Sequence, residues 1–279
     1  MPLRALAQEV RPAPRADRLA AVLLPALASS PKRPVALAFA LAFALAFGLA
    51  PVLPAAIGAP LAGRQVPDTL AQRVQACTAC HGRDGRASPE GYLPRLAGKP
   101  AGYLFNQMEH FRQGRRGNAA MTHLLDNLSP AYLREIADHF ASLELPYPPP
   151  PPATAGPAVM QRGRSLAFEG DAALALPGCV ACHGKALMGA APAMPGLLGL
   201  PRDYLLGQIG AWRTGLRHAN EPDCMAEVAR RLSHADVSAA AAWLSAQPVP
   251  AGARPAPKAA ALPSPAAQDA ALQCGSQPR

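Results

Sequence analysis

The chain has 279 residues, enough for about two small domains, and aromatic side chains make up only 5% of them, so neither domain has much bulk for a core of its own. The formal net charge is +9, but residues 1–66 hold seven Arg and Lys against two acidic residues, whereas residues 67–145 hold nine against eight. The body is therefore almost neutral, and because the sequence contains no nucleic-acid-binding motif, we exclude DNA and RNA as partners.

The N-terminal segment has the organisation of an export signal. Residues 1–34 carry six Arg and Lys, residues 35–50 read VALAFALAFALAFGLA, and mainly Pro and small apolar residues follow up to Ala62. The uncharged run is shorter than the roughly 20 residues that span a membrane. However, the apolar stretch continues to Ala62, so the segment is alternatively a membrane anchor that is not cleaved. We expect residues 1–62 to be a signal peptide or an N-terminal membrane anchor. Either places the rest of the chain in the periplasm, with membrane association if the segment is not cleaved.

Residues 67–145 and 158–248 are two copies of one unit. LPRLAGKPAGYLFNQMEHFRQG at 93–114 aligns with MPGLLGLPRDYLLGQIGAWRTG at 194–215, and both have apolar residues at helical spacing. Ser129 and Ser233 precede the last helical stretch of each copy, where a hydroxyl group caps a helix. No run alternates apolar and polar residues as a strand does. We therefore predict an all-α fold of two tandem small domains, each with three main helices.

Each copy contains the pentapeptide Cys-x-x-Cys-His, as CTACH at 77–81 and CVACH at 179–183. This spacing places two thiols on one side of a helical turn, where they form thioethers to one haem c, and the histidine supplies an axial ligand to the iron. A thioredoxin-like pair requires a βαβ unit, and a zinc site of four cysteines would leave both histidines unused. We predict two covalently bound haem c groups, which also fill the small cores, attached through Cys77, Cys80, Cys179 and Cys182, with His81 and His183 as axial ligands.

The sixth iron ligand is predicted from the repeat. Met121 and Met225 coincide in the two copies, and a His–Met iron has a raised reduction potential. The alternatives are that these methionines fill gaps in the core, or that His123 serves the first iron. Pro94 and Pro195 follow the two pentapeptides at nearly equal distances, so their carbonyls are candidates to accept the Nδ1–H of the histidine ligands.

The remaining histidines and cysteines have less specific interpretations. We expect His110, His139 and His234 to lie on helix surfaces. Cys224, next to Met225, is either an unpaired thiol, a soft competing ligand, or the partner of Cys274 in a disulfide.

Two Pro-rich segments flank the second copy. Residues 146–157 are a linker that favours the extended polyproline conformation. Residues 249–279 form an Ala/Pro tail with little to bury, and we expect it to be disordered.

Several stretches together resemble the cytochrome c4 family of dihaem cytochromes c: CTACHGRDG, FRQGRRG and MTHLLDNLSPAYLREIADHF in the first copy, and CVACHG, PGLLGLPRDYLLGQIGAWRTG and MAEVARRLS in the second. The resemblance covers residues 67–248 and implies two tandem class I cytochrome c domains, each with a His–Met iron, joined by the Pro-rich linker. It also implies a periplasmic carrier of electrons from a quinol-oxidising complex or dehydrogenase to a terminal oxidase. The linker, the tail and the stretch EPDCMAEV depart from the family pattern.

A His–Met iron has no open position for a substrate, so we expect an electron-transfer protein rather than an enzyme. Two alternatives stay open. The cytochrome subunit of a periplasmic dehydrogenase differs only in its partner, whereas a dihaem peroxidase requires a displaceable iron ligand and a nearby acid or base. The four carboxylates of two haems largely offset the positive excess over residues 67–279, so we expect only modest long-range steering of redox partners.

Overall fold

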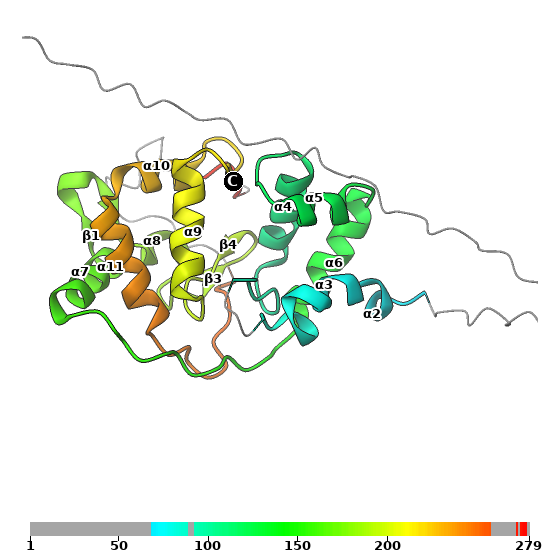
Figure 1. Ribbon diagram of the computed structural model, residues 1–279, viewed down its shortest axis with the longest axis horizontal. Coiled ribbons are helices and arrows are strands. Elements are labelled where there is room, and N and C mark those ends of the chain that lie inside the picture. The colour runs from blue at the N-terminus through cyan, green and yellow to red at the C-terminus, as the bar shows by residue number, and fades with distance from the viewer. Residues whose placement is uncertain (1–67, 89–91, 258–271, 273, 278–279) are drawn as a thin grey trace, which may run out of the picture. The chain divides into compact units, whose positions relative to one another are not determined.

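The computed structural model describes residues 68–88, 92–257, 272 and 274–277 (Figure 1). These residues all belong to one compact unit, Gln65–Arg279. The predicted signal peptide or anchor at residues 1–62 lies outside the described residues. Across the part of the chain that is described, no helix is both long enough and apolar enough to cross a membrane.

The first copy of the repeat is helical. Its elements are α2 (Leu70–Arg73), α3 (Gln75–His81), the 3-10 turn η1 (Arg83–Gly85), α4 (Ala101–Arg112), α5 (Ala119–Leu125) and α6 (Pro130–Ser142). The Oδ1 atom of Asn118 accepts the N–H of Met121 at 3.0 Å, and the Oγ atom of Ser129 accepts the N–H of Tyr132 at 3.2 Å. The predicted cap at Ser129 is therefore confirmed. Helix α6 packs on α4, and Phe140 is buried in their shared core.

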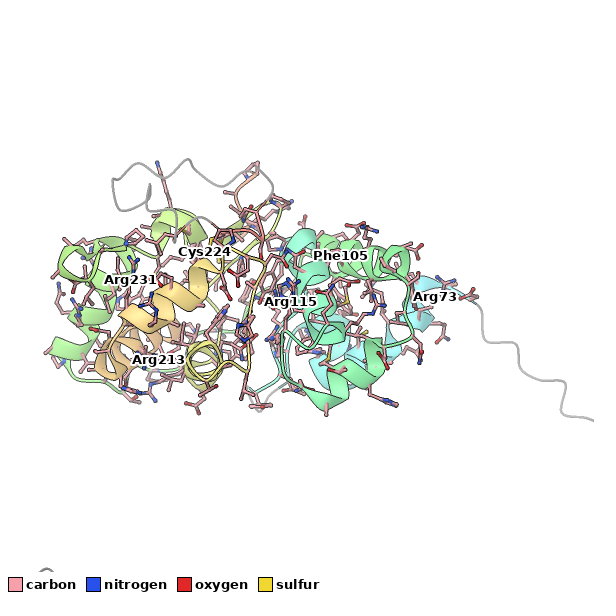
Figure 2. All side chains as sticks on the ribbon, turned by 90° about the horizontal axis from the view of Figure 1, so that it is seen from above. Arg73, Phe105, Arg115, Arg213, Cys224 and Arg231 are labelled. Atoms are coloured by element: carbon pink, nitrogen blue, oxygen red, sulfur yellow. A yellow bond between two sulfur atoms is a disulfide. The ribbon has the colours of Figure 1, made fainter. Side chains whose placement is uncertain are left out.

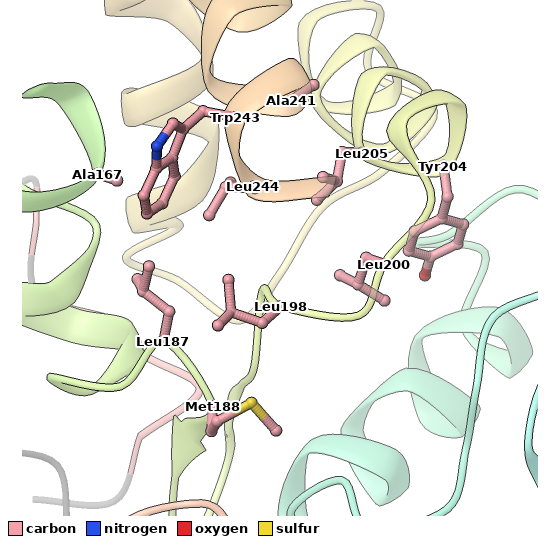
Figure 3. Packing of buried hydrophobic residues seen from close by; sticks show 10 residues of the cluster. All are labelled: Ala167, Leu187, Met188, Leu198, Leu200, Tyr204, Leu205, Ala241, Trp243 and Leu244. Carbon is pink, nitrogen blue, oxygen red and sulfur yellow. The ribbon is translucent and has the colours of Figure 1, made fainter. Parts of the chain in front are cut away.

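The second copy repeats this plan. Its helices are α7 (Pro157–Phe168), α8 (Val180–His183), α9 (Arg202–Arg213), α10 (Cys224–Arg231) and α11 (His234–Ser245). Helix α11 packs on α7 and α9. Gly163 permits the close approach of α7, because a Cβ atom there would overlap the carbonyl oxygen of Ala239 in α11. The core extends from Trp243 to Tyr204 at its opposite edge (Figure 3).

Two short antiparallel hairpins add to the helices of the second copy. Strand β1 (Gly170–Asp171) pairs with β2 (Leu176–Pro177) around the 3-10 turn η2 (Ala172–Leu174), and β3 (Gly189–Ala190) pairs with β4 (Met194–Pro195). The sequence does not predict these strands, because two residues are too few to show an alternating pattern. Apart from these two small hairpins, the predicted all-α fold is confirmed.

The segment that joins the copies is attached at its start. Buried Arg95 donates hydrogen bonds to the carbonyls of Leu145 at 2.5 Å and Pro146 at 3.2 Å. Its guanidinium group also lies 3.9 Å from the centre of the Tyr147 ring, and Tyr147 packs against the core of the second copy. One side chain of the first copy thus fixes the direction in which the chain enters the linker.

Parts of the tail lie against the second copy. The N–H of Ala191 donates to the carbonyl of Ala256 at 2.8 Å, and the N–H of Ala256 donates to the carbonyl of Gly189 at 2.9 Å. Leu272 is buried, and a disulfide joins Cys274 to Cys224. Main-chain pairing and a covalent bond thus hold these residues without a large apolar surface, whereas much of the tail expected to be disordered, including residues 258–271, lies outside the described residues.

The start of α11 leads to a testable prediction about stability. Ser233 and Asp236 form a capping box, and Asp236 also accepts a hydrogen bond from Arg162 in α7 at 2.8 Å. Burial alone would raise the pKa of Asp236, but Ser233 and Arg162 outweigh it and lower that pKa. We expect Asp236→Asn to reduce the free energy of unfolding by about 1–2 kcal/mol near neutral pH.

The pH dependence of this effect has a defined sign. A carboxyl group with a lowered folded-state pKa stabilises the fold above its unfolded-state pKa, and this stabilisation is lost as the pH falls through the folded-state value. The difference between wild type and Asp236→Asn in urea unfolding should therefore shrink below about pH 4. Asp203→Asn, at an exposed position, is the control. If wild type and Asp236→Asn differ equally in stability near neutral pH and below about pH 4, the prediction is wrong.

Candidate haem sites

The two Cys-x-x-Cys-His pentapeptides form equivalent helical turns. The first lies in α3, and the second begins at the N-cap of α8 and continues through that helix. Gly82 and Gly184, which follow the histidines, have φ angles of 75° and 82°, and a Cβ atom at Gly82 would overlap the carbonyl oxygen of Ala87. Glycine therefore lets the chain turn back directly after each histidine. None of the four pentapeptide cysteines takes part in a disulfide: Cys77, Cys80, Cys179 and Cys182.

The histidines of both turns are buried and are held by main-chain carbonyls. His81 donates its Nδ1–H to the carbonyl of Pro94 at 2.8 Å, and His183 donates to that of Pro195 at 2.7 Å. Because a carbonyl only accepts, Nδ1 carries the proton and Nε2 keeps its lone pair. Burial lowers the pKa of both histidines, although the carbonyls oppose it. Both rings are thus neutral near pH 7, which is the form that binds a metal through Nε2.

The cysteines do not assemble into a zinc site. Over the described ranges, no three His, Cys, Asp or Glu side chains are grouped as metal ligands. The four-cysteine zinc interpretation is therefore rejected.

The two predicted methionines lie on equivalent short helices, Met121 in α5 and Met225 in α10. Met121 packs against the same apolar core as Cys77, whereas the alternative ligand His123 is exposed. Met225 and His183 line one cavity, which has about 940 Å³ of space including its open mouth. The fold thus brings each methionine to the core or cavity that its own pentapeptide borders.

Two arginines from equivalent positions meet at the junction of the copies. Arg116 and Arg217 face each other in an antiparallel backbone bridge. In this bridge the N–H of Gly117 donates to the carbonyl of Leu216 at 2.8 Å, and the N–H of His218 donates to the carbonyl of Arg115 at 2.6 Å. Arg115 lies at this junction in Figure 2. The main chain itself therefore connects the two halves.

The guanidinium groups of Arg116 and Arg217 share their acceptors. Arg116 donates to Gln107 at 2.9 Å and to Gln208 at 2.8 Å, and Arg217 donates to the same two oxygens at 2.9 Å and 2.6 Å. Each arginine also reaches a tyrosine hydroxyl of the other copy, Tyr204 at 3.1 Å or Tyr103 at 3.4 Å. The cluster is symmetric, since every member has its counterpart in the other repeat.

This cluster carries an excess of positive charge. Among the described residues, the acceptors of both guanidinium groups are neutral Tyr and Gln oxygens. Burial would raise the pKa of Tyr103, but Arg217, Arg116 and Lys99 outweigh it and lower that pKa to about 8. Because a buried charge without a counter-charge is costly, anions beside the cluster would stabilise it.

A haem with its carboxylate groups fits these surroundings. The cavity has apolar walls that include Leu200 and Leu205, and Arg217 and Trp212 line it as well. The Nε1 atom of Trp212 is buried without an acceptor among the residues described. Apolar walls suit the macrocycle, and haem carboxylates would supply an acceptor for Trp212 and negative charge beside Arg217. The residues present therefore fit the predicted group.

Sequence reasoning missed the arginine cluster and misplaced one histidine. Arg116 and Arg217 align in the repeat, but nothing in the local pattern shows that they meet. His110 is 2% exposed and donates from Nε2 to the Oδ1 atom of Asn220 at 3.1 Å, so its predicted surface position is wrong. The second copy covers that face of α4. Cys224 is in a disulfide with Cys274, which removes it as a competing ligand for the iron.

Known proteins resemble this chain over the repeat region. The thiosulfate dehydrogenase electron acceptor of Thiomonas intermedia is 37% identical over 174 residues, 62% of this chain and 79% of that protein. Cytochrome c4 of Pseudomonas aeruginosa is 35% identical over 175 residues, covering 62% and 84%. The structure of reduced cytochrome c4 from Pseudomonas stutzeri matches with a TM-score of 0.54 at 31% identity, covering 63% of this chain and 95% of that one. No family model matches the chain.

The fold, the paired haem-attachment turns and these relatives together define a dihaem electron-transfer cytochrome c with two covalently bound haem c groups. Most of the length of several relatives is covered at more than 30% identity. The chain belongs to the cytochrome c4 family.

Proposed function

We propose that this chain is a periplasmic carrier that takes single electrons from a dehydrogenase and passes them to a terminal oxidase. The observation that carries the proposal is the junction at Arg116 and Arg217, where two equivalent halves meet, each with its own Cys-x-x-Cys-His turn. Two redox centres held in one compact unit allow an electron to enter at one half and leave from the other.

Each predicted residue has a role in this proposal. The four pentapeptide cysteines hold the haems by thioethers, and the carbonyls of Pro94 and Pro195 fix the tautomer of the histidine ligands. His81 and Met121 are the axial ligands in the first domain, residues 67–145, and His183 and Met225 are those in the second, residues 158–248. The segment 1–62 serves as the export signal.

When bound, each haem iron takes up and releases one electron. The protein's part is to keep the surroundings of both centres constant during this exchange. The carbonyl of each proline holds its histidine in one orientation, and apolar side chains such as Leu205 keep water from the cavity. Arg116 and Arg217 hold positive charge at the junction, where it would offset the mutual repulsion of haem carboxylates.

A dehydrogenase is the preferred donor because of the relatives. The Thiomonas intermedia protein is named as an electron acceptor of thiosulfate dehydrogenase, and its sequence matches this chain across both repeats. The second candidate donor is a quinol-oxidising complex, which membership in the cytochrome c4 family favours.

Stopped-flow absorbance separates the two donors. The oxidised, haem-loaded chain is mixed with thiosulfate and a purified thiosulfate dehydrogenase, or with a quinol and a quinol-oxidising complex. We expect both haems to be reduced rapidly in the first mixture, and only slowly without the dehydrogenase. Rapid reduction in the second mixture alone would replace the proposed donor, and no reduction in either would contradict the carrier function.

A further inference from the structure

A short C-terminal segment is bound beside the predicted sixth ligand of the second haem. We name residues Cys274–Gln277 the C-terminal strap. Its first residue forms a disulfide with Cys224, which begins α10 and directly precedes Met225 (Figure 2). The strap is thus covalently joined to the turn of helix that carries Met225.

Main-chain contacts seat the strap on the loop before α10. The N–H of Gly275 donates to the carbonyl of Pro222 at 3.0 Å, and a Cβ atom at Gly275 would overlap the carbonyl oxygen of Glu221. The Oγ atom of Ser276 accepts the N–H of Asn220 at 3.3 Å. This packing leaves no room for the loop to move toward the strap.

The strap also reaches the first copy and the haem cavity. The Nδ2 atom of Asn106 in α4 donates to the carbonyl of Ser276 at 3.4 Å. Cys274 and Gln277 line the cavity together with His183 and Met225. The Nε2 atom of Gln277 is buried and has no acceptor within the described part of the chain. The strap therefore forms part of the wall of the second haem site.

The first copy has a different arrangement. Its methionine helix, α5, begins with Ala119 and Ala120, which are both exposed, and Ala120 stands where the second copy has Cys224. In the second copy Cys224 is half-buried, whereas the two methionines, Met121 and Met225, are half-buried alike. Two sites with the same predicted ligands thus differ in how the methionine helix is covered.

From these observations we propose that Cys224, Cys274 and the strap are positioning residues that hold Met225 on the iron of the second haem. The disulfide fixes the residue next to Met225, and the strap closes the wall behind it. The first haem, which has no counterpart of the strap among the described residues, exchanges its methionine more readily. This inference rests on the proposed function, because it assumes that Met225 is the iron ligand.

Imidazole binding to the oxidised, haem-loaded protein tests the proposal. Imidazole displaces methionine, and its apparent affinity rises in proportion to the fraction of iron from which methionine has dissociated. The test variant is Cys224→Ala with Cys274→Ala, which gives the second copy the alanine found in the first. We expect the apparent dissociation constant of one of the two binding phases to fall about tenfold, so that the Met–Fe absorption is lost at a lower imidazole concentration. The other phase is expected to stay unchanged.

Two further variants complete the design. Gly275→Ala keeps both cysteines but prevents the strap from packing against the loop, so it is expected to strengthen imidazole binding in the same phase. If the double variant loses haem, this variant tests the proposal in its place. Arg254→Ala removes a tail contact with Glu144 away from the cavity and is expected to bind imidazole like wild type.

The outcomes separate this inference from the proposed function. Unchanged imidazole binding in both strap variants, with the Met–Fe absorption intact, would overturn the positioning role alone. If Met225→Ala leaves the absorption unchanged, the ligand assignment and the positioning role are both wrong.

Discussion

Replacing Met121 with alanine is expected to lower the reduction potential of one haem by the order of 0.1 V and to leave the other haem nearly unchanged. Met225→Ala is expected to do the same at the other centre. A thioether ligand favours reduced iron, and axial ligands move haem potentials over a range of about 0.8 V, so the loss of one sulfur is a large local change. A spectroscopic redox titration that resolves two one-electron steps measures both shifts.

Other methionines in each copy serve as matched controls. Met108 is buried in the core of the first copy and Met188 in that of the second. Met108→Leu and Met188→Leu keep the volume and remove the sulfur, so neither is expected to shift a potential by more than a small fraction of the effect at the ligand. Equal shifts in Met108→Leu and Met121→Ala would show that Met121 acts by packing.

Arg217→Met in the haem-loaded protein is expected to reduce the free energy of unfolding by about 3 kcal/mol and to lower both reduction potentials. Arg217 is buried and shares its acceptors with Arg116. If these two cations neutralise haem carboxylates, removal of one leaves a buried negative charge unpaired. That charge destabilises the fold and favours the oxidised iron at both centres.

The size of this effect discriminates between two electrostatic arrangements. Without carboxylates at the junction, replacing Arg217 with methionine would relieve its repulsion with Arg116 while losing its hydrogen bonds to Gln107, Gln208 and Tyr103, so the loss of stability would be well below about 3 kcal/mol. Denaturant unfolding measures the size of the loss. Arg230→Met is the control, because Arg230 pairs with Glu227 at an exposed position, and its replacement should change stability by less than about 0.5 kcal/mol.

Local features of the sequence predicted the helices, because local interactions set them. Ser129 and Ser233 cap α6 and α11 as expected, and the carbonyls of Pro94 and Pro195 accept the histidine hydrogen bonds. These features depend on spacing along the chain, which the repeat shows twice.

The features that were missed all involve partners distant in sequence. His110 has an ordinary place on α4, but Asn220 covers it, 110 residues further along. Arg116 and Arg217 meet only because the two copies pack together. The disulfide of Cys224 with Cys274, which spans 50 residues, is one of three alternatives that the sequence leaves open. Composition and the spacing of apolar residues do not show which distant residues meet. The sequence therefore predicts the two separate sites better than it predicts their junction.

The backbone bridge between Gly117 and Leu216 has a consequence for how the two copies diverge. Its hydrogen bonds join main-chain atoms, so they do not depend on which side chains the neighbouring positions carry. The surfaces around each haem can therefore change to suit different redox partners while the spacing of the two centres is kept. One half can specialise toward an electron source and the other toward a sink, without either having to preserve the other's sequence.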